Sequence, residues 1–326
     1  MAGHSADDIE FQVDYIYSPA EKQRGRYDTY SPWPIFRSTR RILAGEPDLL
    51  IVSLWRSCIV ALLSKLLCRR LRLVLFLHFP SDAHWLDRFL TRHIAGRAYE
   101  IWADSQETLD LRLPSISPSR TRVISFVTRQ IAPLPIKPVN PVFIFWGRLH
   151  SQKGLDRALG IFSAVHKVFH SARFVIIGPD GGDFSRIEAL VTAMGLEDAV
   201  QFSGGMNFNA IMQQAGSASF YLQTSLLEGM AMSVVEAMQL GLVPVVTPVG
   251  EIGNYCRHDE NALVVTTDRA IVSRIVSLLN DDSQYQLLRK NAVATWAAKP
   301  LYAESVEKAC MEILLMSSDN CSGFNE

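Results

Sequence analysis

The amino-acid sequence predicts an α/β protein built from two doubly wound, Rossmann-like domains. Short runs of β-branched and aromatic residues alternate with longer helix-like runs along the chain, a pattern typical of parallel strands and their crossover helices. A proline-rich segment at 131–141 interrupts this alternation. The 326 residues, of which 48% are hydrophobic, are enough for two cores. We therefore expect two parallel sheets that face each other across a cleft, where the carboxyl ends of the strands hold a ligand.

The first domain is predicted to cover residues 1–135. Its expected strands carry aliphatic residues on both faces, as in a parallel sheet covered by helices on two sides, and they lie at 11–17, 48–54, 72–79, 99–105 and 121–127. The segment IAPLPIKPVNP at 131–141 contains four prolines. Because proline continues neither a helix nor a central strand, we interpret this segment as the interdomain linker.

The second domain is predicted to cover residues 136–300. The alternation of strands and helices restarts here, with strands expected at 142–148, 173–179, 200–205, 219–224, 243–249 and 262–265. A last segment, 301–326, is expected to form a helix that packs back towards the first domain and then a polar tail.

Charge is unevenly distributed along the chain. Residues 1–139 contain 19 Lys and Arg against 14 Asp and Glu, whereas residues 140–326 contain 13 against 19. The basic front half favours an anionic partner such as a phospholipid surface or a phosphorylated acceptor, and a solvated surface without a partner explains it equally well. The excess is too small to indicate nucleic-acid binding.

The cysteine pattern and the hydropathy indicate the compartment. Five scattered cysteines without a C-x-x-C pair argue against a disulfide framework or a zinc ribbon and favour a reducing cytosol. The acidic N-terminal stretch lacks the apolar core of a signal peptide. The apolar part of segment 58–72 is roughly ten residues long, where a membrane span needs about 20. We expect a cytoplasmic protein, with peripheral contact at the inner face of the plasma membrane as an option.

A candidate phosphate site follows the first strand of the second domain. In WGRLHSQKG, Arg148 and Lys153 lie five residues apart in a turn that Gly154 closes before a helix. Backbone amides and the positive helix end bind anions at such turns, and two cations would neutralise a diphosphate. An ordinary turn with surface basic residues is the alternative. The glycines of VIIGPDGGD do not form G-x-G-x-x-G, so a nicotinamide cofactor is not predicted.

Two glutamates stand in the otherwise apolar segment TSLLEGMAMSVVEAM. Glu228 is expected in a loop and Glu236 in the first turns of the following helix. A carboxylate accepts two hydrogen bonds at once, which suits a vicinal diol of a sugar, and backbone amides between Gly229 and Met232 could face a negative charge. The alternative is one surface acid and one acid favoured by the helix dipole.

The order of these motifs resembles the donor-binding half of retaining glycosyltransferase family 4, the group 1 glycosyltransferases of GT-B fold. The resemblance covers about residues 140–265 and combines R-x4-K-G, a glycine-containing loop, E-G-x6-E-A-M and the segment GLVPVVTPVG. It implies that Arg148 and Lys153 bind the diphosphate of a sugar nucleotide and that Glu236 holds its ribose. Glu228 would contact the transferred sugar, together with the backbone of Gly229, Met230 and Ala231.

The front half resembles the acceptor-binding domain of that family more weakly. His78 ends a predicted strand, as a histidine does in the family, and would lie near the sugar as a catalytic residue; a structural role is the alternative. The nearby Asp82 and His84 fall short of a metal site in number and spacing. No strand with a glycine-rich turn precedes Phe11, so the first domain is expected to be shortened.

The resemblance to this family implies a retaining transferase. It would move a sugar from a UDP-, GDP- or ADP-linked donor to a hydroxyl of a glycan or lipid-linked acceptor in cell-envelope polysaccharide or lipopolysaccharide synthesis. No D-x-D triad occurs, so neither a metal nor another cofactor is expected. One alternative is a noncatalytic nucleotide-sugar-binding partner subunit, which the shortened first domain would favour. Another is an epimerase or phosphorylase of the same architecture.

Overall fold

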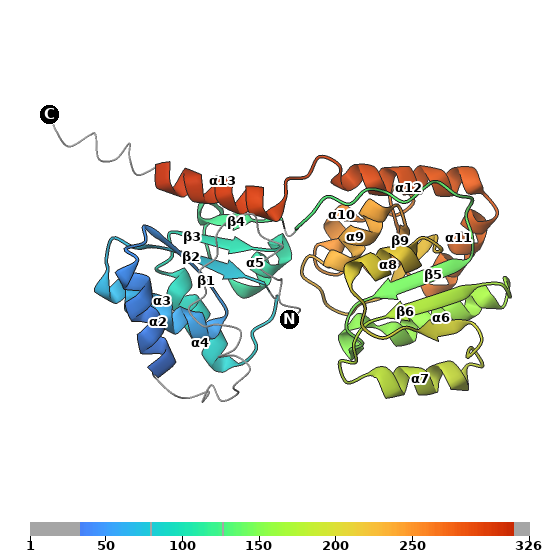
Figure 1. Cartoon of the computed structure of the whole chain (residues 1–326), viewed down its shortest axis with the longest axis horizontal. Coiled ribbons are helices and arrows are strands. Elements are labelled where there is room, and N and C mark those ends of the chain that lie inside the picture. The colour runs from blue at the N-terminus through green and yellow to red at the C-terminus, as the bar shows by residue number, and fades with distance from the viewer. Residues whose placement is uncertain (1–32, 79, 126, 316–326) are drawn as a thin grey trace. The chain divides into compact units, whose positions relative to one another are not determined.

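The computed structural model describes residues 33–78, 80–125 and 127–315. The chain is α/β, as predicted, with two parallel sheets in two compact units (Figure 1). Unit 1 contains the described residues up to Ile124 together with Tyr302–Leu315, and unit 2 contains those from Ser125 to Leu301. The predicted strand at 11–17 and the polar tail lie outside the described residues.

Unit 1 has a four-stranded parallel sheet in the order β1-β2-β3-β4. Because each strand pairs with the next along the chain and such crossovers are right-handed, the connecting helices lie on one face. The strands are β1 (Leu49–Ser53), β2 (Arg72–Leu77), β3 (Glu100–Ala103) and β4 (Thr121–Val123), and the helices are α2 (Trp33–Ala44), α3 (Trp55–Leu67), α4 (Trp85–Ala95), α5 (Gln106–Arg112), the 3-10 helix η2 (Pro118–Arg120) and α13 (Tyr302–Leu315).

The two faces of this sheet have different coverings. Alternate residues of β2, among them Leu73 and Leu75, are buried in one core with the inner sides of α3 and α4. On the opposite face, Phe76 stacks on Tyr302 of α13 with ring centroids 6.3 Å apart, and Arg122 pairs with Glu312 at 2.7 Å. The C-terminal helix therefore completes unit 1, although the whole of unit 2 separates it from β4 in sequence.

Unit 2 has a six-stranded parallel sheet in the order β10-β9-β8-β5-β6-β7. The strands are β5 (Val142–Trp146), β6 (Arg173–Ile177), β7 (Val200–Phe202), β8 (Phe220–Gln223), β9 (Val243–Val246) and β10 (Leu263–Val264). The helices are η3 (Ser151–Lys153), α6 (Leu155–His166), α7 (Phe184–Ala193), α8 (Phe208–Ala215), α9 (Met232–Leu240), α10 (Ile252–Tyr255), α11 (Asp268–Leu279) and α12 (Asp282–Trp296).

The order of the strands reverses between β5 and β8. From β5 the chain proceeds outward to β6 and β7, and then returns to the other side of β5 for β8, β9 and β10. In a doubly wound sheet, ligands bind beyond the carboxyl ends of the strands at this switch point. In unit 2 that position is the region just after Trp146 and Gln223, the last residues of β5 and β8.

An aromatic core holds the central strands together. Phe143 of β5 stacks on Phe220 of β8 at 5.1 Å and packs edge-on against Phe162 of α6 at 5.7 Å. All three rings are fully buried, and burying one such side chain contributes about 1.5–3 kcal/mol. The strand ends that carry the candidate site are thus fixed by a rigid core.

The proline-rich segment predicted as a linker lies along unit 2. The amide of Ile131 donates to Oε1 of Gln239 at 2.9 Å, and the amide of Leu134 donates to the carbonyl of Leu240 at 3.0 Å. Lys137 Nζ donates to the carbonyl of Gly216 at 2.6 Å. An extended proline-rich chain keeps its carbonyls and its remaining amides available for such contacts outside any sheet.

Candidate functional site

The loop after β5 makes close contact with the chain after β8. Gly154 has a left-handed backbone, with φ 62°, at the start of α6. A Cβ atom at this position would lie 2.0 Å from the carbonyl oxygen of Thr224, and the Thr224 hydroxyl donates to the carbonyl of Gly154 at 2.6 Å. Only glycine satisfies both the conformation and the contact. The loop that bears Lys153 is therefore held against the end of β8.

The side chains of Lys153 and Glu228 form an ion pair at this contact. Nζ of Lys153 lies 2.7 Å from Oε1 of Glu228, whose residue is only 7% exposed. The same oxygen accepts hydrogen bonds from Nε2 of Gln223 at 3.0 Å and from the hydroxyl of Ser225 at 2.6 Å. A carboxylate taken out of water is stable only with such partners. Glu228 is thus a buried, fixed acid rather than a surface acid.

A second layer of hydrogen bonds holds Gln223 in place. Its Oε1 accepts from the Tyr221 hydroxyl at 2.6 Å and from the Ser233 hydroxyl at 3.0 Å. Burial, and then the proximity of Glu228 and Glu236, raise the pKa of Tyr221 well above its ordinary value. Tyr221 therefore remains a neutral hydrogen-bond donor. The network connects β8 with the first turn of α9.

Glu236 lies on α9, beside the end of β5. Its Oε2 accepts a hydrogen bond from the indole Nε1 of Trp146 at 3.0 Å. Trp146 is buried and packs edge-on against Tyr221 with ring centroids 4.5 Å apart. The tryptophan thereby orients the partly exposed carboxylate of Glu236 at the carboxyl edge of the sheet.

The backbone between the two glutamates is constrained from one side. Ala231 has a left-handed conformation, with φ 54°, at the N-terminal end of α9. The Tyr255 hydroxyl donates to the carbonyl of Met230 at 2.9 Å, and the amide of Glu251 donates to the carbonyl of Gly229 at 3.0 Å. Gly250 packs so closely that a Cβ there would lie 2.3 Å from the carbonyl oxygen of Glu228.

Arg148 is exposed on the loop after β5 and contacts the glycine loop after β6. A Cβ at Gly181 would lie 2.6 Å from Cγ of Arg148, and the amide of Gly181 donates to the carbonyl of Leu149 at 2.8 Å. A Cβ at Gly178 would lie 1.7 Å from the carbonyl oxygen of Gly147. The glycine segment therefore serves close packing of two loops, a role that its spacing alone does not indicate.

The structure brings seven of the eight predicted site residues into one region of unit 2, and His78 belongs to unit 1. His78 follows β2, and its ring lies 4.5 Å from the ring of Phe76 between centroids. Burial lowers the pKa of His78 below its ordinary value, so the imidazole is neutral at pH 7. It lines a pocket of about 420 Å³ within unit 1, with Trp55, Asp87 and Arg112 among the other lining residues.

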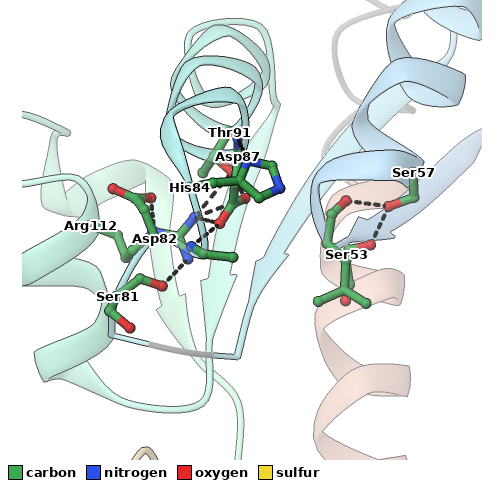
Figure 2. A network of polar contacts seen from close by, with 10 residues as sticks. Ser53, Ser57, Ser81, Asp82, His84, Asp87, Thr91 and Arg112 are labelled. Atoms are coloured by element: carbon green, nitrogen blue, oxygen red, sulfur yellow. Dashed lines mark hydrogen bonds and ion pairs between the residues drawn. The ribbon is translucent and has the colours of Figure 1, made fainter. Parts of the chain in front are cut away.

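Asp82 and His84, considered above for a metal, have structural partners instead. Nε of Arg112 lies 2.8 Å from Oδ1 of Asp82, and its Nη2 lies 3.4 Å from Asp87 (Figure 2). His84 Nδ1 accepts from the amide of Asp87 at 3.1 Å and so caps α4. Among the residues that the structure describes, no three or more His, Cys, Asp or Glu side chains are grouped as a metal site would require.

The predictions from sequence did not include five side chains of the unit 2 network: Trp146, Tyr221, Gln223, Ser225 and Ser233. For Trp146, Gln223 and Ser225 the signal is positional, since each lies at the end of a strand of the central sheet or within two residues of it, where ligand-binding groups concentrate. Gln223 is also an unusual residue for a fully buried strand end, because a buried amide needs several hydrogen-bond partners.

The doubly wound sheets and the loops at their carboxyl ends define a class of α/β proteins that bind ligands at these loops, and the comparisons specify the family. Residues 127–295 match the family model described as glycosyl transferases group 1. Because the match covers more than half of the chain, the protein belongs to this family of glycosyltransferases.

Two curated relatives share about a quarter of their residues with this chain. The chain is 27% identical over 215 residues to GDP-mannose:cellobiosyl-diphosphopolyprenol alpha-mannosyltransferase of Xanthomonas oryzae, with 63% of this chain and 56% of that protein covered. It is 24% identical to one subunit of phosphatidylinositol N-acetylglucosaminyltransferase of Arabidopsis thaliana, with 57% and 43% covered. The chain thus spans about half the length of the curated relatives it matches.

Solved structures establish the fold. Anabaena HepE in complex with UDP and glucose superposes with a TM-score of 0.72 at 19% identity, covering 89% of this chain and 83% of that one. Sucrose-phosphate synthase of Thermosynechococcus elongatus superposes with a TM-score of 0.70 at 19% identity, covering 90% and 81%. The predicted GT-B fold with two Rossmann-like sheets is thereby confirmed.

Proposed function

We propose that this glycosyltransferase binds a nucleoside-diphosphate sugar in unit 2 and transfers the sugar, with retention, to a hydroxyl of a glycan or lipid-linked acceptor, as a member of family 4. The observation that carries the proposal is the Lys153–Glu228 pair at the switch point between β5 and β8. A cation and an acid fixed side by side there suit a ligand that is anionic at one end and rich in hydroxyl groups at the other.

The diphosphate would contact Arg148 and Lys153. Lys153 has three N–H donors, so it can keep Glu228 as a partner while it binds a phosphate oxygen. Arg148 is exposed and close to the glycine loop, a position from which a planar guanidinium can bind phosphate with two hydrogen bonds. Backbone amides at the start of α6 add positive potential.

The sugars would be held by the two glutamates. In this proposal Glu236, oriented by Trp146, accepts both hydroxyls of the ribose. Glu228 and the backbone of Gly229, Met230 and Ala231 contact the transferred sugar. The contacts from Tyr255 and Glu251 to the carbonyls of this segment support the role, since they fix its backbone from the other side.

Transfer would depend on stabilising the departing diphosphate. Arg148, Lys153 and the N-terminal end of α9 would supply positive potential, and one preorganised group of this kind contributes about 2.7–4 kcal/mol to a reaction barrier. The leaving phosphate can itself take the acceptor's proton. His78, neutral at pH 7 because burial lowers its pKa, is proposed to contact the sugar from unit 1.

The relatives support a nucleotide donor and an envelope acceptor. The Xanthomonas relative uses GDP-mannose and a diphosphopolyprenol-linked acceptor by its name, and the solved Anabaena structure contains UDP and glucose. Lipopolysaccharide 1,6-galactosyltransferase of Salmonella typhimurium is 30% identical over 114 residues. We extend this by proposing envelope polysaccharide or lipopolysaccharide synthesis at the inner face of the plasma membrane. No metal or other cofactor is part of the proposal.

A thermal-shift series with UDP-, GDP- and ADP-sugars tests donor binding. A ligand that binds only the folded state at 100 times its Kd stabilises it by about 2.7 kcal/mol, so one nucleotide series should raise the Tm and the others should not. Absence of a shift with every nucleotide sugar would contradict the proposal. A shift without sugar transfer to a membrane extract would instead identify a noncatalytic nucleotide-sugar-binding subunit.

A further inference from the structure

The segment between Glu228 and Glu236 carries two backbone amides without an acceptor. Among the residues that the structure describes, the N–H groups of Met230 and Ala231 donate to no carbonyl and to no side chain. Ala231 is 8% exposed and Met230 is half-buried. Amides that are withdrawn from solvent are normally paired, so these two are donors that a ligand can use.

The carbonyls of the same two peptide groups are held by α10 and the residue before it. The amide of Glu251 donates to the carbonyl of Gly229 at 3.0 Å, and the Tyr255 hydroxyl donates to the carbonyl of Met230 at 2.9 Å. Each carbonyl shares its peptide group with the N–H of the next residue, and in a planar trans peptide group the two point in opposite directions. The amides of Met230 and Ala231 therefore point away from α10.

The backbone of Ala231 depends on this support because it is strained. Its φ of 54° is left-handed, a conformation that residues with a side chain rarely adopt and that persists only where the surroundings enforce it. Ala231 belongs to the buried core of unit 2, and the Tyr255 hydroxyl holds the peptide group directly before it. Loss of that hydrogen bond would let the peptide group rotate and turn its amide away.

Tyr255 is itself firmly held. Its ring packs edge-on against Trp296 with centroids 5.1 Å apart. The side-chain amide of Asn261, a buried residue, donates to the carbonyl of Tyr255 and to the hydroxyl of Thr295, at 2.9 Å each. Burial raises the pKa of Tyr255 well above its ordinary value, so the hydroxyl stays protonated and able to donate. A group fixed in this way can fix its own partner.

We infer that Tyr255 is a positioning residue for the donor. By holding the Met230 carbonyl, it aims the amides of Met230 and Ala231 at an oxygen in the sugar end of the donor, meaning the second phosphate and the transferred sugar. Tyr255 touches no part of the donor itself. The inference rests on the proposed function, because it concerns the same donor. The competing role for Tyr255 is purely structural, in which the hydroxyl only anchors α10 to the loop.

The variant Tyr255→Phe tests the inference because it removes only the hydroxyl. Isothermal titration of the full chain with UDP-glucose, UDP-N-acetylglucosamine, GDP-mannose and ADP-glucose identifies the nucleotide sugar that the original protein binds. We expect its Kd to be about tenfold higher in the variant, the change that follows when one hydrogen bond to a charged group is weakened. The matching nucleoside monophosphate, UMP, GMP or AMP, lacks the sugar end and should bind both proteins equally.

Tyr285→Phe is the matched control. Tyr285 also lies edge-on against a buried ring, that of Phe220, at 5.6 Å, and its hydroxyl also donates to a backbone carbonyl, that of Ser219, at 3.0 Å. Ser219 directly precedes β8, whereas the candidate site follows the carboxyl end of that strand. Tyr285→Phe should therefore lower the Tm to a similar extent as Tyr255→Phe and leave the Kd of the nucleotide sugar unchanged.

The outcomes separate this inference from the proposed function. If the original protein binds a nucleotide sugar and Tyr255→Phe binds it equally well, the inference is overturned and donor binding stands. An equal rise in Kd for the nucleoside monophosphate, or in the Tyr285→Phe control, would overturn it too, because the hydroxyl would then act through general stability. Absence of binding by every nucleotide sugar to the original protein would contradict the proposed function and this inference with it. All titrations are made well below the lowest Tm, so that each variant is folded.

Discussion

Unit 2 and unit 1 use their charged residues in different ways. In unit 2 a half-buried cation and a buried acid are paired inside a hydrogen-bond network at the carboxyl ends of the strands. In unit 1 the helices on one face of the sheet expose basic and aromatic side chains to solvent. Buried polar networks tolerate little change because each lost partner leaves a desolvated group, whereas exposed charges act collectively and are individually replaceable.

The two arrangements of charged residues suit different kinds of recognition. A fixed network selects one ligand geometry, which suits the proposed recognition of a nucleotide sugar, whereas exposed basic side chains impose no single ligand geometry. Single substitutions should therefore have large effects in the unit 2 network and small effects on the exterior of unit 1. Four predictions sharpen this contrast, from the largest expected effect to the smallest.

Lys153→Ala should have the largest effect. It removes a proposed phosphate ligand, with an expected loss in kcat of about 100- to 1000-fold, and it leaves the buried Glu228 without its ion-pair partner, at a cost of about 3–5 kcal/mol in unfolding free energy. Sugar transfer and urea unfolding measure the two effects. Lys167→Ala, at the opposite end of α6, is the control and should change neither. Undiminished turnover of Lys153→Ala would remove the phosphate-binding role.

Gly154→Ala should have the second largest effect. The added methyl group would lie 2.0 Å from the Thr224 carbonyl oxygen at a left-handed position, so the loops after β5 and β8 must separate. We expect a loss of about 2–4 kcal/mol in unfolding free energy. Gly195→Ala is the matched control, because its φ is 64° and no atom lies within 4 Å of the added carbon. It should show only the conformational cost of about 1 kcal/mol. Equal losses of unfolding free energy in the two variants would contradict the close contact between Gly154 and Thr224.

Ser225→Ala should have an intermediate effect. It removes a 2.6 Å hydrogen bond to the Glu228 carboxylate in a buried setting, and hydrogen bonds to charged groups contribute about 1.5–3 kcal/mol. Chemical denaturation measures the loss. Ser217→Ala removes an exposed hydroxyl that bonds to the Gln214 carbonyl and should change stability by less than about 0.5 kcal/mol. Two equally small losses would show that the network is not tightly coupled.

His78→Gln should have the smallest effect on stability, and this effect should depend on pH. Because burial lowers the folded-state pKa of His78, the unfolded chain binds a proton more readily. The stability that neutral His78 provides is fully present above the unfolded pKa of about 6.5 and is lost as the pH falls towards the folded value. Unfolding free energy should thus fall less between pH 7 and pH 5 in this variant. A pH profile identical to that of the original protein would contradict the assignment.

Some parts of the site could be predicted from the sequence because they are local. Lys153 and Gly154 lie in the connection between a buried strand and the helix that follows it, and Glu228 and Glu236 bracket the start of a helix. Periodicity places such residues at strand ends whatever the rest of the chain does. The strands expected from residue 48 onward are all present, and each is shorter than predicted.

Other parts depend on contacts between distant segments. The partner of Lys153 is 75 residues away in sequence. Gln223 has the sequence position of an ordinary strand residue, and only its three hydrogen-bonded neighbours, Tyr221, Glu228 and Ser233, distinguish it. The proline-rich segment had the composition of a free linker, yet its backbone bonds to unit 2. The exposure of Trp33 and Trp85 could not be predicted either, since large aromatic residues are buried on average.

The sequence by itself determined the α/β class, the strand and helix order and the loops that carry the candidate chemistry, because these follow from periodicity and from residues adjacent in the chain. Tertiary structure alone decided the order of strands in each sheet, the burial of Glu228 and the sharing of one helix layer by α2, α3 and α4. These features arise when loops from separate strands meet at one sheet edge, and no local pattern encodes which distant group fills the space beside a given side chain.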